Sequence, residues 1–182
     1  MPATPRIVRA SALALAGLGL TASTMSALPA TAATGGDTSV TTTTTAKKKA
    51  GTVSARKRVA NRVLSARNIA MAQRGDAYAY GAAGPASFDC SGLIRYAYSR
   101  AGLAVPRTSS AQAAAARRIA KKDLRSGDLM FFYGSGGVYH AAIFLRWSRG
   151  HAVMVHSPGS GQRVRVAVPW TSAWFAGTLR RA

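Results

Sequence analysis

Three side chains in this sequence have the types and spacing that nucleophilic catalysis needs. Cys90 is the only cysteine, and it lies in the stretch FDCSGLI, residues 88–94. A cysteine nucleophile needs a base within hydrogen-bond reach and a third group that orients this base. His140 and His156 lie in apolar stretches, whereas His151 follows Gly150 and is predicted to be solvated in a turn. Composition alone favours a buried structural cysteine and a hydrogen-bonded core histidine. The residues that flank them must decide between these structural roles and a catalytic role.

The residues after Cys90 predict a helix that begins at or near this cysteine. Apolar residues follow it at helical spacing, and Gly102 supplies a helix end signal. Backbone N–H groups and the positive end of the helix dipole would then favour the thiolate, which is the reactive form of cysteine. Asp89 either caps this helix or binds substrate, and the sequence leaves both readings open.

The two histidines are predicted to meet across a hairpin. His140 lies inside one predicted strand and His156 near the end of the next, with residues 146–151 as the connection. A hairpin centred near Ser148 would place them directly opposite each other, where Cβ atoms are about 5 Å apart. One imidazole could then orient the other, and a slip of one residue would break this pairing.

The elements that must position these residues are predicted in two groups. A helix is expected from about Ser54 to Arg74, and a third helix from Ser109 or Ser110 to about Ile119. Short apolar or alternating runs then predict strands at residues 128–133, 138–147, 152–157 and 163–168. In the last run Val164, Val166 and Val168 alternate with other residues, as in a sheet with one buried face. Helices followed by antiparallel strands predict an α+β domain.

The first part of the chain resembles an export signal. Arg6 and Arg9 precede an apolar run, and the pattern Ala-Thr-Ala ends at Ala32, so residues 1–32 are predicted to be a signal peptide. The run is too short for a retained anchor, so we expect no membrane attachment after cleavage. Residues 33–54 are rich in threonine and lysine and are predicted to be a disordered linker, leaving 55–182 as the domain. The expected location is secreted, either extracellular or associated with the cell wall.

Charge restricts the partners of this protein. The 182 residues carry 25 Lys and Arg against five Asp and no Glu, a formal charge of +20. Such a surface favours a polyanionic partner, and export favours an anionic cell wall over nucleic acid. We expect no metal or cofactor, because one cysteine and two histidines at this spacing match no compact zinc pattern. A monomer is expected.

Six ordered sequence blocks resemble those of the NlpC-type peptidoglycan peptidases over about residues 55–182. The blocks are YAYGA (78–82), FDCSGLI (88–94), PRTSSAQ (106–112), SGDLMFF (126–132), YHAAIFL (139–145) and MVHSP (154–158). The resemblance implies a papain-like cysteine peptidase domain, with N-terminal helices packed on an antiparallel sheet. It also implies hydrolysis of amide bonds in peptidoglycan stem peptides, commonly between D-γ-glutamate and the diamino acid.

The resemblance also implies roles for individual residues. Cys90 matches the nucleophile, His140 the general base and His156 the polar group that orients it. Tyr78 matches the tyrosine near the oxyanion. Asp89 and Ser91 match substrate-contacting positions, and Arg107 and Ser109 border the same groove. The chain departs from the family at Ala82 and at the dipeptide 141–142, where added methyl groups would narrow the groove.

Two alternatives stay open at this point. The same fold could cleave the muramoyl-L-alanine amide or transfer an acyl group. A non-catalytic basic module that binds the wall or nucleic acid would leave Cys90 incidental; its support is the high positive charge.

Overall fold

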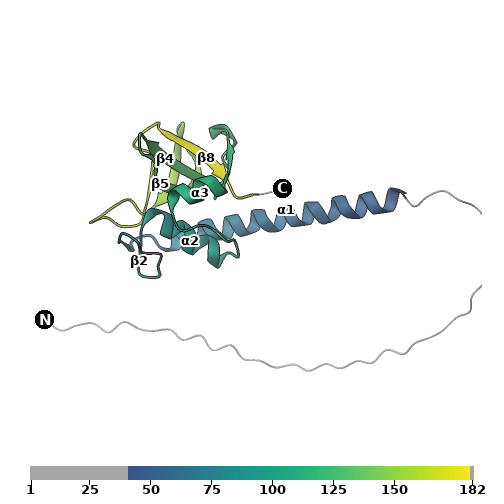
Figure 1. Cartoon of the computed structure of the whole chain (residues 1–182), viewed down its shortest axis with the longest axis horizontal. Coiled ribbons are helices and arrows are strands. Elements are labelled where there is room, and N and C mark those ends of the chain that lie inside the picture. Colours follow the sequence, from purple (N-terminus) through teal and green to yellow (C-terminus); the bar gives the residue numbers. More distant parts are fainter. Residues whose placement is uncertain (1–40, 181–182) are drawn as a thin grey trace, which may run out of the picture. The chain divides into compact units, whose positions relative to one another are not determined.

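The computed structural model describes residues 41–180, with side chains for 51–180. The predicted signal peptide and the first part of the predicted linker lie outside the described residues. The elements, in chain order, are α1 (Thr41–Ala72), β1 (Ala77–Tyr78), β2 (Ser87–Phe88), α2 (Cys90–Arg100), α3 (Ser109–Ala115), β3 (Arg117–Ile119), the 3-10 helix η1 (Lys121–Asp123), β4 (Leu129–Gly134), β5 (Gly137–Ser148), β6 (His151–His156), β7 (Arg165–Ala167) and β8 (Trp174–Thr178) (Figure 1).

Helix α1 begins earlier than the sequence predicts. It starts at Thr41 instead of near Ser54, so residues 41–54 are helical where a disordered linker is expected. The expectation rested on the lack of apolar residues there, but no proline interrupts the segment, and its alanines and lysines are good helix formers. The apolar side chains that α1 buries, Val63, Ala66 and Ala70, lie in its second half.

The third helix is shorter than predicted. Thr108 caps α3 by accepting a hydrogen bond from the Ala111 N–H, and the helix ends at Ala115 instead of Ile119. Residues 117–119 instead form β3, which pairs with β8 in antiparallel register. The alanine-rich sequence is compatible with a continued helix, but the β8 edge offers cross-strand hydrogen bonds that a local pattern cannot reveal.

Six strands form one antiparallel sheet in the order β3, β8, β4, β5, β6, β7. Strands β4, β5 and β6 match the predicted runs closely, whereas β3 and β8 are not among the predicted strands. The alternating valines are only partly buried: Val164 is 2% exposed, but Val166 and Val168 are 37% and 53% exposed. Val166 lies in β7, which is at the edge of the sheet and has only one neighbouring strand, so the alternation there does not indicate a buried face.

The sheet carries an apolar cluster on each face. One cluster joins the helices to the sheet through residues such as Val63, Leu93 and Ile143. The second contains the alternate residues of the same strands, such as Phe132, Phe144 and Met154. Successive side chains of a strand point to opposite faces, so His140 and His156 share the face of the second cluster. Helices α1, α2 and α3 lie on one side of the strands (Figure 1).

Candidate active site

Cys90 is the first residue of α2, as the sequence predicts, and it is half-buried. The backbone N–H groups of Ala141 and Ser91 lie close enough to its sulfur to lower the pKa of the thiol. The first of these donors follows His140 directly on β5, so the helix terminus meets the strand at the predicted base. Within residues 51–180, no direct hydrogen bond joins Cys90 to His140.

The electrostatic surroundings of Cys90 differ from the expectation. The position of Cys90 at the start of a helix predicts a stabilised thiolate, but burial raises the pKa of the Cys90 thiol above its ordinary value. The two N–H donors lower this pKa and the nearby Asp89 carboxylate raises it, and the result is a net increase. Desolvation disfavours the charged form more than the local donors favour it. A raised pKa favours the protonated thiol over the thiolate at neutral pH.

His140 and His156 lie in contact. His140 Nε2 is 3.0 Å from His156 Nδ1, and the two ring planes are 89° apart. They do not face each other directly across the strands, because Ile143 pairs with Val155 and Phe144 with Met154. In that register His156 lies diagonally from His140 on the same face of the sheet. Two imidazole rings are long enough to meet across this diagonal.

The hairpin turn explains why the predicted register is wrong. The connection is the two-residue turn Arg149-Gly150, whose φ angles are 48° and 78°. Two positive φ values are typical of the type I′ hairpin turn, which centres the hairpin after Ser148. A bulge between Phe144 and Arg146 then moves the register back by one residue, which leaves His156 opposite position 142 instead of His140. As expected, His151 is exposed beside this turn.

Both catalytic candidates on the sheet are neutral imidazoles. Burial, with a smaller contribution from the neighbouring His156, lowers the pKa of His140 to about 3. Burial also lowers the pKa of His156 to about 4, assisted by the charge of Arg165. His156 is 1% exposed, and its Nε2 atom has no hydrogen-bond partner among the described residues. A neutral imidazole near a protonated thiol can accept its proton, which is the chemistry of a general base.

Trp170 covers the histidine pair and is absent from the predicted site. Its ring stacks on Phe132 at 4.5 Å and lies 5.2 Å from His140 and 5.8 Å from His156. It is nevertheless 55% exposed, so one face of the ring borders solvent. The residue lies in the connection from β7 to β8, and no spacing in the sequence relates it to His140. Only the proline before it and its aromatic type distinguish it locally.

Asp89 is engaged within the protein. It caps α2 by accepting from the Gly92 N–H at 2.7 Å, and it accepts from the Gly81 N–H at 2.9 Å. Arg107 donates to both of its carboxylate oxygens, at 3.0 and 2.5 Å. Burial by itself raises the pKa of Asp89, but the hydrogen bonds and charge of Arg107 and the Gly92 N–H outweigh it, so the pKa lies below its usual range.

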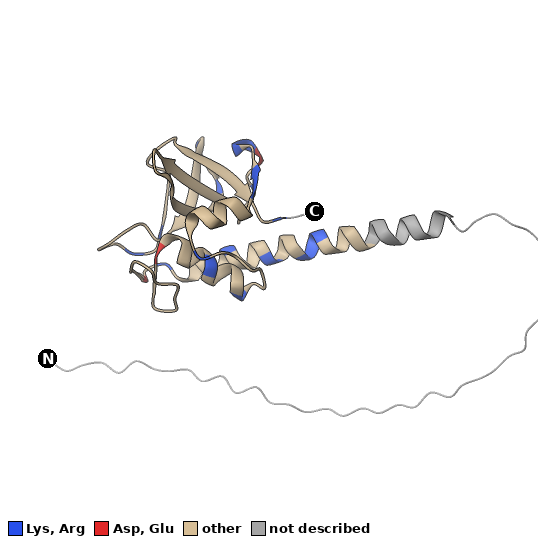
Figure 2. Cartoon of the chain, in the orientation of Figure 1, with Lys and Arg blue, Asp and Glu red and all other residues tan. Residues whose placement is uncertain are grey.

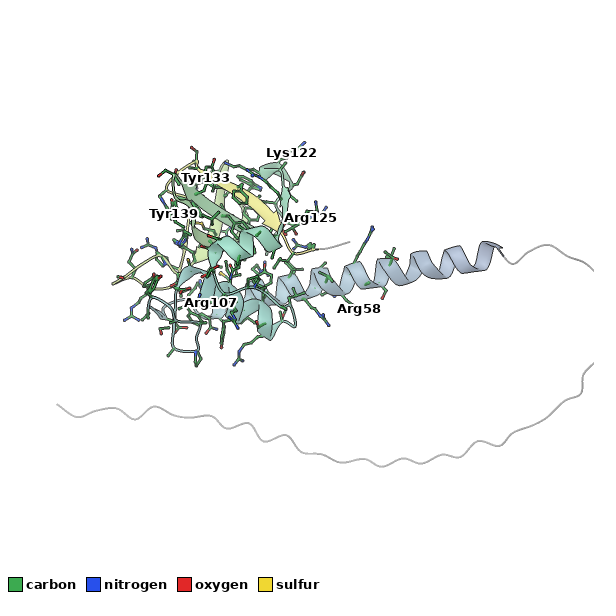
Figure 3. All side chains as sticks on the ribbon, viewed as in Figure 1. Arg58, Arg107, Lys122, Arg125, Tyr133 and Tyr139 are labelled. Carbon is green, nitrogen blue, oxygen red and sulfur yellow. The ribbon has the colours of Figure 1, made fainter. Side chains whose placement is uncertain are left out.

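The other predicted groove residues surround this cluster. Ser91 is buried; it donates to Asp89 and accepts from Arg107. Ser109, half-buried at the start of α3, lies 3.5 Å from the Val138 carbonyl oxygen on β5. Tyr78 is half-buried on β1, where burial is the main cause of a raised phenol pKa and the nearby Asp89 carboxylate adds to the increase. In Figure 3, Arg107 lies beside α2 below Tyr139, and Lys122 and Arg125 lie to the right of both.

Close packing holds the Cys90 turn against its neighbouring loop. A methyl group on Gly92 would overlap the Ala82 carbonyl oxygen, so only glycine allows this approach. Ser157, next to His156, donates to the Phe88 carbonyl oxygen at 2.7 Å and ties β6 to the same turn. Ala141 and Ala142 are buried in the two apolar clusters, so their methyl groups do not narrow a groove as expected.

A cysteine at the start of a helix, packed against an antiparallel sheet that carries a histidine, defines the papain-like α+β fold. Residues 75–181 match the NlpC/P60 family. The chain belongs to the NlpC/P60 family.

Individual relatives agree with this assignment. The chain is 40% identical over 95 residues to the probable endopeptidase p60 of Listeria monocytogenes, covering 51% of this chain and 19% of p60. It is 42% identical over 104 residues to a probable endopeptidase of Mycobacterium tuberculosis, covering 57% of this chain and 25% of the relative. It therefore spans a quarter or less of these two proteins.

Solved structures share the fold. The peptidoglycan hydrolase RipB of Mycobacterium tuberculosis matches with a TM-score of 0.58 and 29% identity, over 68% of this chain and 67% of that one. RipD of the same organism matches with a TM-score of 0.54 and 28% identity, over 65% and 97% of the two chains. RipD is described as a non-catalytic NlpC/p60 domain protein adapted to peptidoglycan binding. Membership alone therefore does not imply catalysis.

Two further findings concern the described residues only. No group of three His, Cys or Asp side chains there could hold a metal ion. None of the described helices has the length and apolar character needed to cross a membrane.

Proposed function

We propose that this protein is a secreted cell-wall endopeptidase that hydrolyses amide bonds in peptidoglycan stem peptides through the Cys90 thiol. The favoured bond joins D-γ-glutamate to the diamino acid. One observation carries the proposal: the half-buried thiol at the start of α2 contacts the N–H that follows His140, and His140 is hydrogen-bonded to His156. A non-catalytic wall-binding protein has no need of this arrangement.

The geometry supports a specific proton path. For His140 to accept the thiol proton at Nδ1, its Nε2 must carry hydrogen and donate to His156 Nδ1, 3.0 Å away. His156 then carries its own hydrogen on Nε2. Its role is to hold the His140 tautomer and ring orientation, as the third member of a triad does.

The reaction then follows in two balanced steps. As substrate binds, His140 takes the thiol proton and the sulfur attacks the peptide carbonyl carbon. The C–N bond breaks, the imidazolium gives its proton to the leaving amine, and an acyl-enzyme remains. Water, activated by the same imidazole, cleaves the thioester and restores the thiol. Because the resting thiol and imidazole are uncharged, proton transfer from Cys90 to His140 is itself a step of the reaction.

The remaining predicted residues are assigned supporting roles. Tyr78 stays protonated because the pKa of its phenol is raised, so it can donate to the oxyanion together with backbone N–H groups at residues 90–91. Asp89 and Ser91 are already bonded to each other and to Arg107, so they contribute mainly by holding the Cys90 turn. Arg107, whose side chain is 30% exposed, and Ser109 border the substrate groove.

Digestion of purified peptidoglycan tests the function. We expect the wild-type protein to release new stem-peptide fragments, detected by mass spectrometry, and the Cys90→Ala variant to release none. The fragment masses distinguish cleavage after D-γ-glutamate from muramoyl-L-alanine amidase or acyl-transfer activity. If the wild-type protein binds peptidoglycan but releases no fragments, the chain is a binding protein, which is how RipD is described.

Export is tested separately. We expect a monomer in the culture medium or on the wall of the producing cell, with an N-terminus after Ala32. N-terminal sequencing of the exported protein measures the cleavage site. Retention of the apolar run after Arg9 would contradict the predicted signal peptide.

A further inference from the structure

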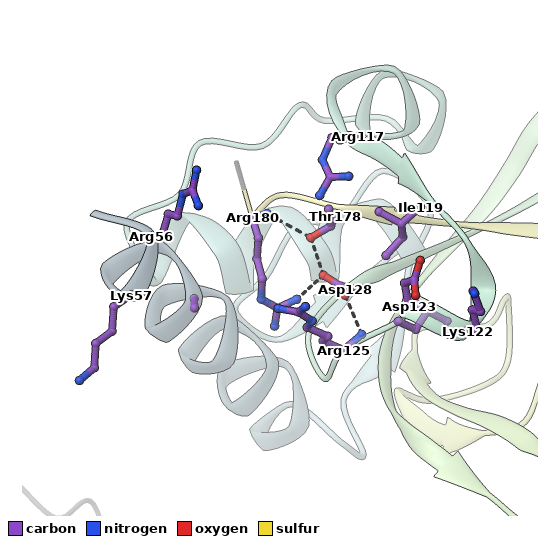
Figure 4. A pocket seen from close by; sticks show the side chains of 12 residues that line it. Arg56, Lys57, Arg117, Ile119, Lys122, Asp123, Arg125, Asp128, Thr178 and Arg180 are labelled. Carbon is purple, nitrogen blue, oxygen red and sulfur yellow. Dashed lines mark hydrogen bonds and ion pairs between the residues drawn. The ribbon is translucent and has the colours of Figure 1, made fainter. Parts of the chain in front are cut away.

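A pocket of about 740 Å³ lies apart from the Cys90 site, and it shares no residue with that site. It is bounded by the described part of α1, by β3 and η1, by the turn before β4 and by the residues around the end of β8. Its lining consists of Arg56, Lys57, Ala60, Arg117, Ile119, Lys122, Asp123, Leu124, Arg125, Asp128, Thr178 and Arg180 (Figure 4). Four separate segments of the chain therefore contribute cations to one hollow.

The positive charge of this pocket is mostly uncompensated. Of its two acidic residues, Asp128 is fully engaged: it pairs with Arg180 and accepts from the Thr178 hydroxyl and the Arg125 N–H. Among residues 51–180, ion pairs occur only at Asp89 and Asp128. Arg56, Arg117 and Lys122 therefore carry charges without a paired carboxylate, as do Lys57 and Arg125.

The neighbouring cations on the same segment differ. Arg118 lies over the Phe175 ring at 4.3 Å, and Lys121 lies over the Trp174 ring at 4.0 Å and also donates to the Ser172 carbonyl. Both thus have partners within the domain. Arg117 and Lys122, adjacent to them in sequence, line the pocket instead (Figure 4). Figure 2 shows the basic residues of this region beside few acidic ones.

The pocket therefore fits an anionic ligand that carries several charges. Cations gathered around a concavity reinforce one another's field more than scattered surface charges do. Arginine guanidinium groups bind phosphate oxygens in pairs, and lysine adds a point charge. We propose that this pocket binds a phosphate-bearing anionic glycopolymer of the cell wall and so holds the enzyme on its substrate.

The lining favours a wall polymer over nucleic acid. Single-stranded nucleic acids are usually held by aromatic side chains on which bases stack. The pocket contains no Phe, Tyr or Trp, so it can bind a charged backbone but offers no stacking surface. That the polymer belongs to the cell wall rests on the proposed function, whereas anion binding by the pocket does not.

Binding is tested with the full chain carrying Cys90→Ala, so that failure of catalysis cannot affect the result. The probe is fluorescently labelled poly(glycerol phosphate), followed by anisotropy across a salt series. We expect the double variant Arg117→Glu/Lys122→Glu to bind roughly tenfold more weakly and to show a smaller salt dependence. The matched control Arg95→Glu/Arg146→Glu reverses two exposed charges outside the pocket and should stay within about twofold of the parent.

The outcomes separate the alternatives. Equal weakening by the two double variants would mean that charge acts diffusely, and the pocket proposal would be wrong. Tighter, pocket-dependent binding of a single-stranded DNA with the same number of phosphates would also overturn it. With Cys90 restored, the pocket variant should digest intact walls more slowly but match the parent on walls stripped of phosphate polymers. Equal digestion of both wall types by both proteins would contradict the anchoring role.

Discussion

The two imidazoles of the site are kept neutral by their neighbours more than by each other. Phe132 and Trp170 flank His140, and Trp170 also lies over His156. Burial is the largest cause of both lowered pKa values. A residue that is itself half exposed therefore controls how much water reaches the proposed base. Its contribution is to position and desolvate the pair, since it carries no group that could transfer a proton.

Replacing Trp170 with alanine should expose the pair without unfolding the domain. Because desolvation is reduced, the pKa of His140 should rise toward its ordinary value of about 6.5, and hydrolysis should fall roughly tenfold as ring orientation is lost. NMR titration of the imidazoles and fragment release measure the two effects. The control Trp147→Ala removes another partly exposed ring, one that packs against Phe144, and should change neither. Unchanged histidine titration in Trp170→Ala would contradict the shielding role.

The Cys90 thiol should titrate like a buried group. Because burial raises its pKa, its alkylation by iodoacetamide should slow about tenfold for each pH unit below about 8.5. Rates measured by mass spectrometry between about pH 6 and pH 10 provide the test. A rate that stays constant down to about pH 6 would indicate a resting thiolate–imidazolium pair, in conflict with the uncharged pair described above.

At the scale of the elements, the site depends on how α2 meets the loop before it. The first turn of α2 touches the backbone of Ala82, and Asp89 binds the loop through the Gly81 N–H. Arg107 then connects this turn to the segment that leads into α3. The turn that carries Cys90, the proposed nucleophile, thus contacts the loop at Gly81 and Ala82 and the segment that leads into α3.

A methyl group at Gly92 should separate these elements. Gly92→Ala is expected to destabilise the domain by about 3 kcal/mol, because the Ala82 backbone cannot move aside as a flexible side chain can. Urea unfolding measures the change. Gly134→Ala is the matched control, since the nearest atom to its added methyl would be a Tyr139 ring carbon at 3.9 Å, an ordinary contact. Equal stability of the two variants would show that the close approach of Gly92 to the Ala82 carbonyl oxygen does not contribute to the stability of the domain.

Removing the Asp89 carboxylate should destabilise the same junction. Asp89→Ala loses the helix cap and leaves Arg107 without its ion-pair partner, at an expected cost of about 2–4 kcal/mol. Thermal unfolding provides the measurement. If the variant keeps its stability but loses substrate affinity, Asp89 acts by binding substrate and the positioning role is wrong.

For the whole molecule, the buried histidines should make stability depend on pH. Both have lower pKa values in the folded than in the unfolded chain, so the unfolded chain binds more protons below about pH 6.5. Their contribution is complete above that pH and is lost as pH falls toward about 4 and 3. Asp89 has a lowered pKa, so its contribution persists until more acidic conditions.

Urea unfolding between about pH 7 and pH 5 should therefore show a loss on the order of 1 kcal/mol per pH unit. The double variant His140→Asn/His156→Asn should show a flatter profile over this range, even if its stability at neutral pH is lower. Equal slopes in the two proteins would mean that other groups cause the acid sensitivity.

The candidate site was largely accessible from the sequence because its signals are local. The N-cap Asp89 and the apolar spacing specify the start of α2, and Gly102 marks its end. Continuous apolar runs specify the strands that carry His140 and His156. The contact between the two histidines was expected for an incorrect reason, because the type I′ turn and the bulge change the register. Diagonal neighbours on one face can still meet, so His140 and His156 are in contact although the predicted register is wrong.

The sequence by itself determined the helix that presents Cys90, the central strands, the excess of positive charge and the likeness to the NlpC/P60 family. Only the tertiary structure decided the pKa values, the cover provided by Trp170, the internal engagement of Asp89 and the gathering of cations at one pocket. These depend on desolvation and on the approach of residues distant in the chain: Trp170 contacts His140, and Arg56 and Arg117 line one pocket. Composition and spacing carry no record of such contacts, because they arise only when the elements pack.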